Sequence, residues 1–145
     1  SGGTAEVISS IENVYKWGLF RYPLKQSWNN DRVILIGDAA HPTLPFLAQG
    51  AAMAIEDSFV LASKIFEFSN SSVAFKEFRR ERFPRVQRVV LASTKNAQIF
   101  HLSNIISRRV FQVSLRFLSK FFPHLLVKRF NWIYDHNVTN KNYSS

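Results

Sequence analysis

The side chains best suited to chemistry lie in one stretch, residues 32–58, which reads RVILIGDAAHPTLPFLAQGAAMAIEDS. An apolar run at residues 33–36 predicts a buried strand, and Gly37 and Asp38 end it. A carboxylate at the end of a strand lies where open α/β sheets bind their ligands. After a loop with two prolines, Gly50 begins a predicted helix whose first turn has no bulky or charged side chain. Its unpaired N–H groups and its dipole attract negative charge, so the stretch indicates half of a cofactor pocket.

The order of these residues resembles the second flavin-binding motif of the single-component FAD-dependent aromatic hydroxylases, such as the salicylate and hydroxybenzoate hydroxylases. The matching positions span about twenty residues, and a bare Gly-Asp pair would be far weaker evidence. Looser likeness extends to Trp28 upstream, to an arginine-rich helix downstream and to residues 132–134. The motif positions are Gly37, Asp38, Ala39, Ala40, His41, Pro45, Gln49, Gly50, Glu56 and Asp57.

The resemblance implies a role for each part of this motif. Asp38 would hydrogen-bond the ribityl chain of FAD, and the backbone at Gly50 would approach the flat ring closely. The loop at residues 45–49 would shape the space where reduced flavin, O2 and substrate meet, and would keep water away. The implied cofactor-binding residues are Gly37, Asp38, Pro45, Gln49, Gly50, Ala51 and Ala52, and the implied substrate contacts are Pro45 and Phe46. No catalytic side chain and no metal ligand is assigned.

The intact protein would then be an oxidoreductase, a monooxygenase that uses FAD, O2 and NADH or NADPH as co-substrate to hydroxylate an aromatic or similar ring of a small substrate. Reduced flavin is anionic at one edge of its pyrimidine ring, which the N–H groups of Ala51 and Ala52 would face. The chain has five glycines, and none forms the G-x-G-x-x-G turn that binds a dinucleotide pyrophosphate. We therefore expect a missing N-terminal half, and a split gene, a truncated chain and a subunit with a separate partner fit equally well.

Three titratable residues in the motif have structural interpretations. A histidine is a candidate acid or base by residue type, but the resembled chemistry does not need His41, so we interpret it as structural. Glu56 and Asp57 are adjacent on the predicted helix and point about 100° apart, so they are not a catalytic carboxylate pair. We expect them to pair with arginines.

The expected fold is a mostly helical α/β fragment of a Rossmann-like FAD-binding fold. A short strand pair would precede the flavin-binding strand, loop and helix. One strand is expected over residues 15–24 and the flavin-binding strand over 33–36, with a turn at residues 29–31 between them. Ser71 or Ser72 would cap the helix that follows the motif, and Pro84 would kink or restart it. The expected helices span residues 4–13, 50–68, 73–100, 102–122 and 124–134.

Charge and composition limit the other classes of function. Hydrophobic residues make up 46% of the chain, and the absence of cysteine excludes disulfides and thiolate sites. Residues 101–145 hold seven lysines or arginines and one acid, Asp135. These bases are interleaved with large apolar groups, so the segment suits either the missing half of the protein or an anionic membrane surface. No recognition motif accompanies the charge, so we expect no binding to nucleic acid.

The expected division has three parts. Residues 1–30 would end the substrate-domain sheet, residues 31–100 would form the second half of the FAD-binding domain, and residues 101–145 would form a basic helical segment. The apolar runs are too short to span a membrane, and no signal peptide is evident, so a cytoplasmic protein with optional peripheral membrane contact is expected. The alternative function is a non-catalytic basic helical module that binds a membrane surface or a partner protein.

Overall fold

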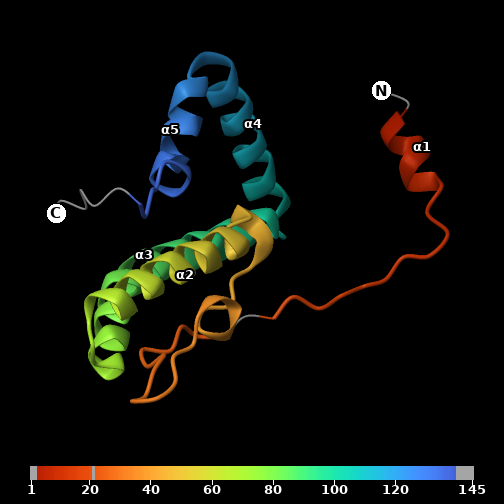
Figure 1. The fold of residues 1–145 in the computed structure, drawn as a ribbon. Coiled ribbons are helices and arrows are strands. Elements are labelled where there is room, and N and C mark those ends of the chain that lie inside the picture. The colour runs from red at the N-terminus through yellow and green to blue at the C-terminus, as the bar shows by residue number, and fades with distance from the viewer. Residues whose placement is uncertain (1–2, 21, 140–145) are drawn as a thin grey trace.

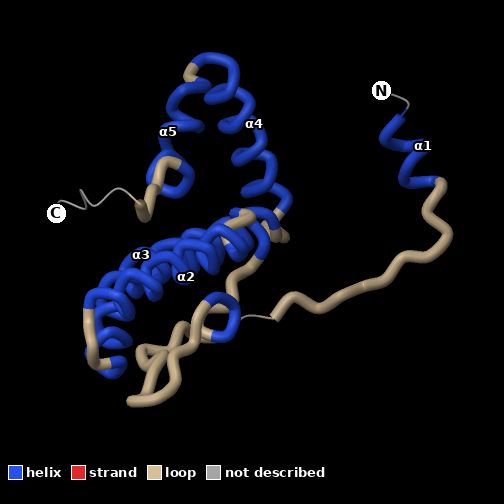
Figure 2. The backbone as a smooth tube through the Cα atoms, in the orientation of Figure 1, coloured by secondary structure: helices blue, strands red, loops and turns tan. Residues whose placement is uncertain are grey.

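The computed structural model describes residues 3–20 and 22–139, and within these ranges the chain is built of helices joined by loops (Figures 1 and 2). A short helix, α1 (Gly3–Ser9), lies at the end of an extended arm, away from the other helices. Two single-turn 3-10 helices follow, η1 (Gly37–Ala39) and η2 (Pro45–Leu47). The remaining helices are α2 (Gly50–Glu67), α3 (Ser71–Phe100), α4 (Ile105–Phe121) and α5 (Pro123–Tyr134).

The helices α2 and α3 lie side by side and form the body of the molecule, while α4 and α5 form a second helical hairpin (Figure 1). Asn70 caps α3, because its side-chain oxygen accepts hydrogen bonds from the N–H groups of Ser72 and Val73 at 2.9 and 3.3 Å. The prediction of a serine cap was therefore wrong by one or two residues. Asn104 caps α4 in the same way, through the N–H groups of Ile106 and Ser107.

The mostly helical prediction is confirmed, but the predicted strand pair does not form in the described part of the chain. Residues 15–20 and 22–24 are extended without a partner, and Arg21 lies outside the described residues. The region 33–36 makes only an isolated antiparallel bridge, from Asn29 to Ile34. A strand exists only when a neighbour completes its ladder of hydrogen bonds, and these residues provide no such neighbour.

The turn between these two segments agrees with the sequence. The Asn30 side chain accepts hydrogen bonds from the N–H groups of Arg32 and Val33 at 2.9 and 2.7 Å. The same turn brings Leu35 N–H to within 2.8 Å of the Trp28 carbonyl. The side chain of Trp28 is thereby held against α2 and α3.

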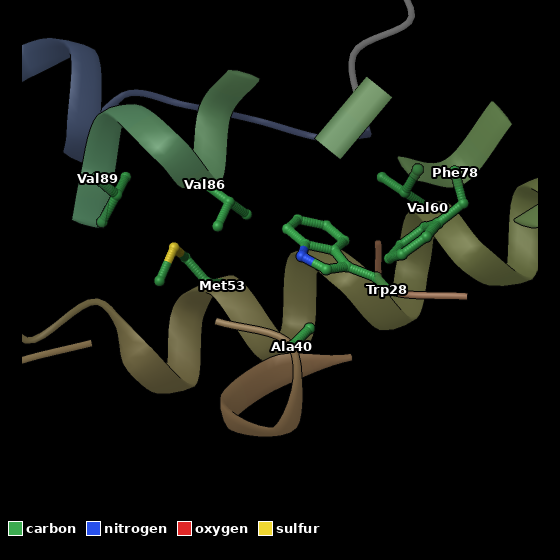
Figure 3. Close-up of a cluster of buried hydrophobic side chains, with 7 residues drawn as sticks. All are labelled: Trp28, Ala40, Met53, Val60, Phe78, Val86 and Val89. Atoms are coloured by element: carbon green, nitrogen blue, oxygen red, sulfur yellow. The ribbon is translucent and has the colours of Figure 1, made fainter. Parts of the chain in front are cut away.

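The hydrophobic core lies between α2, α3 and this turn. Trp28 is 2% exposed and fills the centre of the cluster (Figure 3). The indole ring lies 5.5 Å from the ring of Phe83, centroid to centroid, and 5.4 Å from the His41 ring. The other members of the cluster are Ala40, Met53, Val60, Phe78, Val86 and Val89.

The helix α3 runs past Pro84 without ending, so of the two expected alternatives, a kink or a new helix, the new helix does not form. A proline inside a helix removes one backbone hydrogen bond. Val86 and Val89, just beyond Pro84, are both fully buried in the core. Their packing offsets the lost bond, because helix stability in proteins comes mainly from tertiary contacts.

Candidate functional site

The turn at Gly37 and Asp38 needs a backbone conformation that favours glycine. Gly37 has φ +56°, in the left-handed region, and a Cβ there would lie 3.3 Å from the Cβ of Ala54 on α2. Its N–H donates to Asp57 Oδ2 at 2.9 Å, and its carbonyl accepts from the N–H groups of Ala40 and His41. Since both polar groups of Gly37 are used within the protein, this residue shapes the turn that carries Asp38.

Asp38 lies beside the start of α2, as the sequence predicts. The side chain is exposed, and its Oδ1 is 3.8 Å from the position that a Cβ on Gly50 would occupy. No side chain caps α2 at Gln49, and the first hydrogen bond of the helix runs from Met53 N–H to the Gln49 carbonyl. The N–H groups of residues 50–52 therefore face outward from the helix start, next to a carboxylate.

A network of buried charged residues contacts this turn on the side that faces the core. Asp57 is fully buried and also accepts from His41 Nε2 at 2.6 Å and from Arg82 Nε at 2.8 Å. Arg82 contacts Glu56 Oε2 at 2.7 Å, and Arg85 contacts Glu56 Oε1 at 3.1 Å. The predicted pairing of Glu56 and Asp57 with arginines is thus confirmed.

The network sets the charge state of its acids. Burial alone would raise the pKa of Asp57, but hydrogen bonds from His41, the Gly37 N–H and Arg82 outweigh burial, so the pKa lies below its ordinary value. Burial likewise opposes ionisation of Glu56, and the contacts with Arg85 and Arg82 hold its pKa down. Both acids are therefore ionised and paired at neutral pH, and they serve structure rather than proton transfer.

His41 belongs to this network and not to the exposed face of the turn. Its side chain is 1% exposed and packs against Trp28. A carboxylate only accepts hydrogen bonds, so the Nε2 of His41 carries the hydrogen that binds Asp57. The geometry agrees with the structural role expected from the sequence.

The loop between the turn and α2 presents the two residues expected to contact substrate. Pro45 is exposed at the start of η2, Phe46 is half-buried and Leu47 is buried. Ala48 follows with φ +51°, a left-handed conformation that is strained for a residue with a side chain. A cavity of about 450 Å³ lies between residues 42–44 of this loop and α3, and its lining includes neither Asp38 nor Gly50.

Comparison with known proteins identifies the family. Residues 2–93 match the FAD binding domain family. The chain belongs to this family. The resemblance to aromatic hydroxylases is also confirmed, because similar proteins carry such names. The 3-amino-4-hydroxybenzoate 2-monooxygenase PtmB3 of Streptomyces platensis is 38% identical over 99 residues, which is 68% of this chain and 25% of that protein.

Two further relatives extend the comparison. The 3-hydroxybenzoate 6-hydroxylase of Polaromonas naphthalenivorans is 36% identical over 124 residues, covering 83% of this chain and 29% of the relative. The 6-hydroxynicotinate 3-monooxygenase of Bordetella bronchiseptica is 43% identical over 89 residues, covering 57% of this chain and 23% of the relative. This chain therefore spans about a quarter of the length of the curated relatives that it matches.

The residues present suit the part of FAD near its flavin ring. An exposed carboxylate can accept hydrogen bonds from hydroxyl groups, and outward N–H groups at a helix start favour an anionic edge. A Cβ built on Gly50 would be in ordinary contact, without a clash, with Asp38 Oδ1 and Thr43 Cγ2, both at 3.8 Å. The sequence contains no glycine pattern for the pyrophosphate, so the fit is limited to one end of the cofactor.

Proposed function

We propose that this chain forms the flavin-ring side of the active site in a monooxygenase that hydroxylates a small aromatic substrate. NADH or NADPH would be the co-substrate, and the glycine-rich turn for the pyrophosphate would come from a further N-terminal part. Bound FAD would carry electrons from the reduced nicotinamide to O2 and so enable oxygen transfer to the ring. The names of the similar proteins support an aromatic substrate.

The residues of this chain would bind and shield the reacting groups. The Asp38 carboxylate would accept hydrogen bonds from cofactor hydroxyls, and the N–H groups of Gly50, Ala51 and Ala52 would stabilise negative charge on the reduced ring. Pro45 and Phe46 would form an apolar wall against the substrate, while Gln49 would complete the loop. The observation that carries the proposal is the Asp38 carboxylate beside the uncapped start of α2.

The test is Asp38→Ala in the intact FAD-loaded protein. Loss of a hydrogen bond to a charged group costs about 1.5–3 kcal/mol, so we expect FAD affinity to fall by about ten- to a hundredfold. Flavin absorbance after gel filtration measures occupancy, and thermal unfolding checks that the fold persists. Asp135→Ala, an exposed acid at the end of α5, is the matched control. Full FAD retention by Asp38→Ala would contradict the proposal.

A second candidate function concerns α4, which we propose contacts an anionic lipid surface. The helix has no buried residue and no acid, and its basic residues are Arg108, Arg109, Arg116 and Lys120. Spacings of three or four residues align an apolar strip along α4 whose members are 55–70% exposed. This strip consists of Ile106, Val110, Val113, Phe117 and Phe121. None of the helices in residues 3–20 and 22–139 is long and apolar enough to cross a membrane.

Vesicle co-sedimentation of the intact protein tests this second candidate. We expect binding to vesicles that contain phosphatidylglycerol, weaker binding in high salt and none to phosphatidylcholine alone. Val113→Glu should abolish binding, whereas Ile65→Glu, at an exposed site on α2, should not. If Val113→Glu instead lowers the melting temperature and no vesicle binds the parent protein, the strip packs against protein and the lipid proposal is wrong.

A further inference from the structure

The last two turns of α3 hold the loop that carries Phe46. Ser93 is 1% exposed, and its hydroxyl donates to the Leu44 carbonyl at 2.7 Å. Seven residues later, Phe100 stacks on Phe46 with ring centroids 5.7 Å apart and an interplanar angle of 24°. Residues seven apart lie two turns along the same face of a helix, so one face of α3 contacts the loop at two places.

A second ring fixes the Phe46 side chain from another direction. His101 lies edge-on to Phe46, at 5.8 Å and 87°. The Nδ1 of His101 is 2.8 Å from the Ala97 carbonyl, and a carbonyl only accepts, so Nδ1 carries the hydrogen. This bond ties the His101 ring to the end of α3. Phe46 is thus placed by one stacked ring and one perpendicular ring, both geometries that aromatic pairs prefer.

We propose that Phe100 and His101 are positioning residues that set where the Phe46 ring stands and so determine which ring substituents the substrate site accepts. This inference rests on the proposed function, in which Phe46 lines the substrate space. The two residues act through Phe46 and not by touching cofactor or substrate themselves. Because Phe46 is only half-buried, loss of the stacking ring would free its side chain without opening the core.

The experiment compares Phe100→Ala with Phe46→Ala and the double variant in the intact FAD-loaded protein. Phe66→Ala is the matched control, since Phe66 on α2 is 95% exposed. The readouts are the dissociation constants for two hydroxybenzoates that differ by one ring substituent, FAD occupancy and melting temperature. We expect Phe100→Ala to change the ratio of the two constants about tenfold, Phe46→Ala to change it similarly, and the double variant to add little more. Phe100→Tyr, which keeps the stacked ring, should have the same ratio of the two dissociation constants as the parent protein.

Hydrogen exchange of the segment 42–49 provides a readout that needs no substrate. Phe100→Ala should speed exchange in this segment while FAD occupancy stays within twofold of the parent. An unchanged ratio of constants, additive effects in the double variant or unchanged exchange would each overturn the inference. If the protein binds FAD but neither binds nor hydroxylates any aromatic compound, the proposed function fails. The exchange result then decides separately whether α3 positions the loop.

Discussion

At the scale of single residues, the Asp57 carboxylate joins parts of the chain that are far apart in sequence. It binds the Gly37 N–H and His41 from the turn and Arg82 from α3, all at 2.6–2.9 Å. Its lowered pKa means that these contacts stabilise the fold only while the carboxylate is ionised. The turn that presents Asp38 therefore depends on a residue that cannot itself reach a ligand.

The free energy of unfolding should fall in acid because Asp57 and Glu56 have lowered pKa values in the folded protein. Their contribution is fully present above the ordinary values of 3.8 and 4.5, and it is lost as pH falls through the lower folded values. Urea unfolding between pH 7 and pH 2 measures this. Asp57→Asn should be less stable at pH 7 by about 3–5 kcal/mol, because it leaves Arg82 partly unpaired. The free energy of unfolding of this variant should also depend less on pH below 4.5 than that of the parent protein.

Asp135→Asn, which changes an exposed acid, should keep the parental pH profile in the same measurement. If Asp57→Asn follows that profile as well, the buried carboxylate is not the source of the acid sensitivity.

Gly37 and Gly50 should respond differently to added side chains. Gly37→Ala places a Cβ at positive φ and 3.3 Å from Ala54, so it should cost about 1–2 kcal/mol of folding stability. Gly50→Val would bring its Cβ only to ordinary contact distance from Asp38 and Thr43, 3.8 Å from each, so the melting temperature should change little while FAD occupancy falls. Thermal unfolding and flavin absorbance distinguish the two effects. A Gly50→Val protein that keeps its FAD would reduce Gly50 to an ordinary helix-start residue.

At the scale of elements, α3 connects most of the molecule. It supplies core residues to the contact with α2, holds the loop through Ser93, and reaches α5 through Arg85. The guanidinium of Arg85 donates to the carbonyls of Trp132 and Ile133 at 2.9 and 3.0 Å. The helix α4 has no comparable set of buried contacts.

The two asparagine caps should therefore matter to different extents. Each side chain accepts two backbone hydrogen bonds, so each alanine substitution removes about 1 kcal/mol from its own helix. We expect Asn70→Ala to lower the melting temperature, because α3 is packed into the core. Asn104→Ala should instead increase local hydrogen exchange in α4 with little change in melting temperature. Equal shifts in melting temperature would mean that α4 unfolds together with the core.

In the molecule as a whole, many large apolar side chains of the described residues are exposed. The exposed groups lie on the N-terminal arm, on the open side of α2 and along α4, and they include Trp17, Phe20 and Phe66. Such surface favours association with other protein or, along α4, with the lipid surface proposed above. It is consistent with a chain that spans a quarter of the length of its relatives.

The 145-residue chain by itself should bind FAD weakly and show no hydroxylase activity. One carboxylate and the helix start provide about two or three hydrogen bonds, of roughly 1 kcal/mol net each. Since the cost of association must still be subtracted, we expect a dissociation constant in the millimolar range or weaker. Titration with FAD, followed by flavin fluorescence or calorimetry, measures it. Submicromolar binding by the monomer would contradict the proposed division of the cofactor site.

The local features of the candidate site can be predicted from residue types and their spacing. The order of Gly37, Asp38 and Gly50 within some fourteen residues predicts a turn followed by an uncapped helix start, and the structure has both. The pairing of Glu56 and Asp57 with arginines also followed from their charge and place on a helix. The turn and the helix start depend on neighbours along the chain, so residue types and spacing are enough to predict them. The charges of Glu56 and Asp57 predict that arginines pair with them, but not which arginines.

The contacts between residues far apart in the chain could be seen only once the helices were packed. Asp57 pairs with Arg82 across 25 positions, and Ser93 binds the Leu44 carbonyl across 49. Periodicity identifies the face of a helix but not its partner or register, so the support from Phe100 and His101 had no signal in the sequence. The predicted strands do not form for the same reason, because an apolar run of four residues becomes a strand only when a neighbouring strand pairs with it.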